Sequence, residues 1–104
     1  MMIPKRVKVG AVYYDVKIVD TPLVVDGKEC CGKITFSQQL IEIRGEPFQS
    51  AQSMVNTFWH ELVHAFTYER GIEWGEEDEL YTEELAKAMH AFCVDNGVRF
   101  EGAA

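Results

Sequence analysis

The alternation of apolar and polar positions predicts strands in the first half of the chain. Val7 to Val9 and Val12 to Val19 are rich in β-branched and aromatic residues, which favours two strands joined by a short turn. Lys33 to Phe36 and Leu40 to Ile43 also alternate, and the intervening Ser37-Gln38-Gln39 indicates that they form a hairpin. We therefore expect a small antiparallel sheet before residue 45.

The second half has the three- to four-residue periodicity of helices. A first helix is predicted from Pro47, which suits a first helical turn, to Arg70, with Gly71 as a left-handed cap. Its apolar residues form one stripe that should face a core: Ala51, Val55, Phe58, Leu62, Ala65 and Phe66.

A second helix is predicted from Glu77 to Asp95, ended by Asn96-Gly97. Its main apolar face would consist of Tyr81, Leu85, Ala88, Met89 and Phe92. A narrower strip of small residues should lie against the first helix, because small side chains let two helices approach closely: Thr82, Ala86 and Cys93. Sheet and helices together predict a single α+β domain over residues 1–104.

The first helix contains the motif H-E-x-x-H at His60, Glu61 and His64. Residues i and i+4 lie on one face of a helix, so both imidazoles can reach one metal ion on the side opposite the apolar stripe. Glu61 would lie beside that ion, where a general base is needed. Because three fixed positions can also arise by chance on a solvated helix, the motif needs a third ligand to support it.

A catalytic zinc usually has three protein ligands and one open position. The long metzincin motif is excluded, because Thr67 and Arg70 stand where it requires glycine and histidine. A carboxylate on the second helix remains. Helical phase favours Glu79, on the strip of small residues, with Glu83 as the second candidate. The depth of His64 within its helix favours a residue beyond Glu79, unless the two helices cross at an angle.

These residues resemble a known family. The run HELVHAFTYERGIEW, followed by an acid-led helix that ends in VDN, is similar to small phage and prophage zinc metallopeptidase-like proteins, compact relatives of the ImmA/IrrE-type gluzincins. The resemblance covers nearly the whole chain, including KRVKVGAVYYDVKIVD and CGKITF upstream, but HELVHAF and the helix after it are its most specific part. It implies a zincin-like hydrolase whose third ligand opens the downstream helix, which corresponds to Glu79 here.

Composition narrows the classes of partner. The net charge is −7 and the acids gather between Glu69 and Glu84, which argues against nucleic acid and favours a divalent cation or basic peptide segments. No apolar run is long enough for a membrane span or a signal peptide. Three cysteines, Cys30, Cys31 and Cys93, are an odd number and are expected to be reduced. We therefore expect a cytoplasmic protein, in a bacterial host if the phage resemblance holds.

The mechanism expected from these residues is zinc-dependent peptide hydrolysis. His60, His64 and Glu79 would bind Zn²⁺, and Glu61 would take a proton from the bound water that attacks a peptide carbonyl. Tyr68 and His90 are weaker candidates for polarising that carbonyl. The alternatives are a binding module in which zinc only clamps the two helices, and a metal-free phage interaction protein.

The expected partner is a peptide or protein substrate, which such sites receive as an added strand beside the motif helix. Either Leu40 to Ile43 or Lys33 to Phe36 would provide the sheet edge that accepts it. The sequence fixes neither the substrate nor the oligomeric state.

Overall fold

The first half of the chain folds into hairpins, as the alternating pattern predicts. In the computed structural model, which describes residues 3–101, β1 (Arg6–Val9) pairs antiparallel with β2 (Val12–Val19). β5 (Gly32–Thr35) pairs antiparallel with β6 (Leu40–Arg44) through the short 3₁₀ turn η1 (Phe36–Gln38). The predicted hairpin of β5 with β6 and the two predicted strands β1 and β2 are confirmed. Residues 1–2 and 102–104 of the predicted domain lie outside the described residues.

The sheet has the strand order β1-β2-β6-β5, and its two central strands run parallel. This pair corrects the expectation of an antiparallel sheet. Parallel neighbours need a connection that leaves the sheet and returns. Here that connection carries a further hairpin that the alternating pattern did not indicate, β3 (Leu23–Val25) with β4 (Lys28–Cys30).

The strand order also decides which candidate is the sheet edge. β6 is paired on both sides, so the proposal of Leu40 to Ile43 as an edge is wrong. β5 is the last strand of the order, and it contacts the first helix. The second candidate, Lys33 to Phe36, therefore contains the open edge.

The two predicted helices are present, as α1 (Ala51–Arg70) and α2 (Asp78–Asn96), joined through the 3₁₀ turn η2 (Gly75–Glu77). α1 begins at Ala51 rather than at Pro47, because the hydroxyl of Ser50 accepts a hydrogen bond from the Ser53 N–H at 3.1 Å and caps the helix there. Both helices end at glycines with φ of +67°, as predicted. The α+β class is confirmed.

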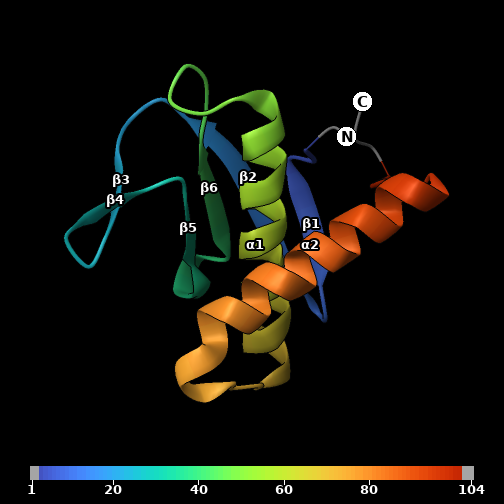
Figure 1. Cartoon of the computed structure of the whole chain (residues 1–104). Coiled ribbons are helices and arrows are strands. Elements are labelled where there is room, and N and C mark those ends of the chain that lie inside the picture. Colours follow the sequence, from blue (N-terminus) through green and yellow to red (C-terminus); the bar gives the residue numbers. More distant parts are fainter. Residues whose placement is uncertain (1–2, 102–104) are drawn as a thin grey trace.

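Figure 1 shows α1 lying against the sheet and α2 crossing α1 on its other side. The predicted stripe of α1 supplies much of the core through Val55, Phe58, Leu62 and Ala65. Ala51 is exposed and Phe66 only partly buried. Alternate strand residues meet this stripe: Val7, Val9, Tyr14, Val16, Ile41 and Ile43.

The face by which α2 packs differs from the expectation. Its strip of small residues is buried, with Thr82 at 0% and Ala86 at 2% exposure, whereas Leu85 and Phe92 of the predicted main apolar face are 41% and 63% exposed. The reason is that α1 is the helix's main partner, and close crossing at α1 requires small side chains. Some apolar residues of α2 are exposed, but neither described helix combines the length and apolar content needed to cross a membrane.

Candidate metal centre

The two motif histidines lie side by side on α1, on the side that faces α2. Their ring centroids are 4.9 Å apart with an interplanar angle of 74°. The side chains are 19% exposed at His60 and 16% exposed at His64, so both are partly buried yet still reachable. The spacing of four residues has placed both rings in one site, as helical geometry requires.

The carboxylate of Glu79 bridges the two rings. Its oxygens lie 3.0 Å from His60 Nε2 and 2.9 Å from His64 Nε2. A tetrahedral zinc with bonds of about 2.0–2.1 Å separates its ligand atoms by about 3.3 Å. Among the described residues, His60, His64 and Glu79 form a group whose ligand atoms all lie within 4.8 Å of one another. Two imidazoles and one carboxylate are a donor set suited to zinc, so these residues fit the ion.

The helix crossing explains why Glu79 can reach His64. α2 crosses α1 obliquely instead of lying along it (Figure 1), and Glu79 in the first turn of α2 contacts both His60 and His64. The depth of His64 within α1 therefore no longer argues against Glu79, and Glu79 is favoured over Glu83 as the third ligand. Asp78 Oδ2 is 3.9 Å from His64 Nδ1, which is too long for a hydrogen bond.

Glu83, the second candidate ligand, takes another place in the site. Its Oε2 lies 3.1 Å from His60 Nδ1, on the opposite side of the ring from Glu79. An Nδ1–H that donates to Glu83 leaves the lone pair of Nε2 available for a metal and fixes the ring's orientation.

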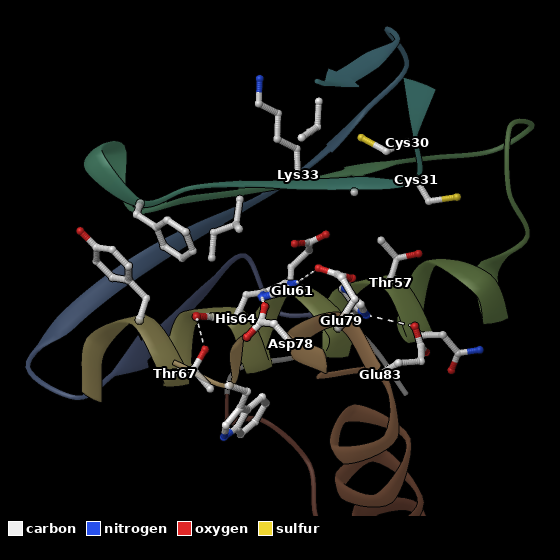
Figure 2. A pocket seen from close by; sticks show the side chains of 18 of the residues that line it. Cys30, Cys31, Lys33, Thr57, Glu61, His64, Thr67, Asp78, Glu79 and Glu83 are labelled. Atoms are coloured by element: carbon white, nitrogen blue, oxygen red, sulfur yellow. Dashed lines mark hydrogen bonds and ion pairs between the residues drawn. The ribbon is translucent and has the colours of Figure 1, made fainter. Parts of the chain in front are cut away.

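Glu61 is buried beside this group, at 8% exposure. Burial raises the pKa of Glu61 from 4.5 to about 7, His60 acts to lower it, and the charge of Glu79 raises it further. Figure 2 shows Glu61, His64 and Glu79 gathered in the space between β5 and the two helices. The carboxyl group thus lies where a proton acceptor is needed, next to the histidines but separate from the three ligand atoms.

Gly32, at the start of β5, allows the sheet edge to approach Glu61. A Cβ at this position would overlap Thr57 Cγ2 and would lie 3.0 Å from Glu61 Oε2. Only a residue without a side chain fits between this strand and α1. No sequence pattern predicts this contact, because the glycine follows two cysteines in an otherwise ordinary strand.

Gln49 ties the same region together from the loop before α1. Its amide nitrogen donates to the carbonyl oxygens of Arg44 at 2.7 Å and Cys31 at 3.3 Å. Its amide oxygen accepts hydrogen bonds from the hydroxyls of Ser53 at 2.7 Å and Thr57 at 3.1 Å. Gln49 therefore joins β5 and β6 to α1. This role was not predicted, because a helix that begins at Pro47 would place Gln49 inside its first turn.

A cleft of about 1000 Å³ runs between β5 and the helices and contains the whole group. Tyr68, which is 54% exposed, lines the cleft and stacks on Phe36. His90 does not line it, because its ring stacks on Trp59 at 5.9 Å. The three cysteines are free, as expected, and Cys30 and Cys31 line the cleft.

Comparisons of the chain with protein-family models, with curated proteins and with solved structures give no match. The functional interpretation therefore depends on the chemistry of the cleft.

Proposed function

We propose that the protein is a zinc-dependent peptide hydrolase. The observation that carries this proposal is the convergence of three donors from two helices: Nε2 of His60 and Nε2 of His64 each lie within 3.0 Å of one carboxylate, that of Glu79. A buried acid, Glu61, accompanies them inside an open cleft. Donors, base and cleft are the three parts that metal-assisted hydrolysis requires.

Each residue has a separate role. His60, His64 and Glu79 hold the ion, which when bound supplies a Lewis acid and lowers the pKa of water toward neutrality. A carboxylate oxygen of Glu61 accepts the proton of the attacking water and returns it to the leaving nitrogen. Glu83 orients the His60 ring through its Nδ1.

The open edge of β5 supports an extended peptide as the substrate. Register with β6 directs the backbone groups of Cys31 and Lys33 inward, as the 2.8 Å bond from the Arg44 N–H to the Cys31 carbonyl indicates. Alternation then turns the N–H and C=O groups of Gly32 and Ile34 toward the open side. A peptide strand that pairs there passes beside Glu61, which is next to Gly32.

The test is the Glu61→Gln variant. Removing the proton acceptor should lower peptide cleavage by about a hundredfold or more, while bound zinc, measured by elemental analysis, stays at the wild-type level. Glu84→Gln is the matched control, since it removes an acid on α2 that does not line the cleft. Equal cleavage by the wild type and Glu61→Gln would refute the general-base role.

A second candidate function rests on the two-helix origin of the ligands. Because the donors come from both α1 and α2, zinc would clamp the helices even without hydrolysis. Zinc in the purified protein with no cleavage of any peptide would favour this binding module. The phage resemblance and the bacterial cytoplasm as the location stay predictions.

A further inference from the structure

We infer that the end of the cleft beyond His64 is a subsite for a long cationic side chain, arginine or lysine, located on the N-terminal side of the peptide bond that is cleaved. This inference rests on the proposed hydrolase function, because it names the substrate class for the same cleft.

The first observation is an aromatic surface at that end. Phe36, just after β5, and Tyr68, near the end of α1, stack with ring centroids 4.1 Å apart and an interplanar angle of 7°. Trp74 lines the same cleft and is held edge-on by Tyr81 at 5.7 Å. Tyr68 is 54% exposed, and Phe36 and Trp74 are partly buried, so part of this aromatic surface is open to the methylene groups and the charged head of a long cationic side chain.

The second observation is the charge beside those rings. Glu73 and Asp78 line the cleft together with Trp74. Among the described residues that line the cleft, Lys33 is the one lysine or arginine, and Figure 2 shows it pointing away from the histidines. A cationic side chain bound at these rings can pair with the two carboxylates, which an apolar side chain cannot do.

The direction of the guest follows from the direction of β5. Gly32 lies against Glu61, and Phe36 lies against Tyr68, so β5 runs alongside α1 in the same sense. A peptide that pairs antiparallel, the more stable arrangement, runs from the Tyr68 end toward Glu61. Its residues before the cleaved bond therefore occupy the aromatic end. The rise of α1 from His64 to Tyr68 is about 6 Å, or about two residues of a strand.

The experiment uses fluorescently labelled, alanine-rich hexapeptides that carry arginine, lysine, norleucine or glutamate at one position. Their affinities are measured on the zinc-loaded Glu61→Gln variant, and the products of the wild-type protein are mapped by mass spectrometry. We expect arginine and lysine peptides to bind about tenfold more tightly than the norleucine peptide. Cleavage should fall one or two residues after the cation.

Glu73→Gln should reduce the preference for arginine over norleucine by about fivefold, because it removes one carboxylate from the subsite. Glu77→Gln is the matched control, since it removes the same charge from an exposed residue that does not line the cleft and should leave the preference unchanged. An equal loss of this preference in the two variants would overturn the subsite, because the preference would then depend only on the overall negative charge of the protein.

Two other outcomes would also overturn the inference: equal binding of arginine and norleucine peptides, or cleavage on the N-terminal side of the cation. The subsite and the hydrolase can fail separately. Selective binding without cleavage by the wild type would support the subsite and refute hydrolysis. Cleavage by the wild type without a preference for arginine or lysine would support hydrolysis and refute the subsite.

Discussion

Gly32 shows how far one missing side chain can control a site. The strand edge and the motif helix meet at this residue, with Thr57 and Glu61 in the space that a Cβ would fill. Spacing within the HExxH motif fixes where the histidines point, but it does not fix how near the sheet edge comes to them. That distance depends on Gly32.

We therefore expect Gly32→Ala to destabilise the protein by about 1–3 kcal/mol, because the strand or α1 must shift to accept the methyl group. Cleavage should fall as well, since Glu61 is displaced with the strand. Urea unfolding measures the first effect and peptide turnover the second. Adding Thr57→Ser removes the overlapping methyl group but keeps the hydroxyl that bonds Gln49, so the double variant should recover part of both losses. Failure to recover would contradict the steric explanation.

Tyr14 is a buried residue that links the sheet to α1. Its side chain is fully buried, and its hydroxyl donates to Glu69 Oε2 at 2.6 Å. Burial, and then the hydrogen bond to Glu69, raise the pKa of Tyr14 above its usual 10.0. The unfolded chain therefore loses this proton at lower pH than the folded protein does.

It follows that the contribution of Tyr14 to stability is constant below pH 10 and is lost as the pH rises further, by about 1.4 kcal/mol per pH unit. Tyr14→Phe should be less stable at pH 7 by about 1–2 kcal/mol but should lose less stability between pH 10 and 11. Urea unfolding over this pH range measures both effects. Tyr13→Phe is the control at an exposed neighbour. Equal losses in Tyr14→Phe and the wild type would contradict the assignment.

At the scale of elements, sequence patterns predicted the features that depend on interactions between residues near in sequence. Periodicity and turn residues were sufficient for the pairs β1–β2 and β5–β6, for both helices and for the left-handed Gly71, but not for the hairpin β3–β4. The parallel pairing of β2 with β6 depends on long-range packing, which leaves no mark in an alternating pattern. The same distinction holds for the site. The HExxH motif and helical phase predicted Glu79, whereas the hydrogen bond between Glu83 and His60 depends on how the two helices cross.

The packing of α2 through small residues gives a prediction for this element. Ala86→Leu should lift α2 from α1, because Ala86 is 2% exposed at the crossing. We expect a loss of about 1–3 kcal/mol in stability and a weaker affinity for zinc, since Glu79 moves with the helix. Calorimetric titration with zinc measures the affinity. Ala88→Leu makes the same change at an exposed position of α2 and should alter neither quantity. Equal effects of the two substitutions would show that the crossing is not the cause.

At the scale of the whole molecule, the proposed ion would add a link between α1 and α2 through His60, His64 and Glu79. Zinc at a hundredfold excess over its Kd should stabilise the fold by about 2.7 kcal/mol, which raises the Tm by on the order of 10 °C in a chain of this size. Thermal unfolding with and without a chelator measures this shift. His64→Ala should abolish it, and His90→Ala should keep it, because His90 stacks on Trp59 away from the cleft. If the Tm of the wild type is the same with and without the chelator, the metal site is contradicted.

The parallel pairing of β2 with β6 has a consequence for how the protein folds. Each hairpin of the sheet can form from neighbouring residues, but Asp15 meets Leu40, and Val19 meets Arg44, only after the long intervening segment has closed into a loop. Loop closure of this kind costs entropy before any contact compensates for it. Docking of one hairpin on the other should therefore limit the folding rate, whereas β5 can pair with β6 before that step.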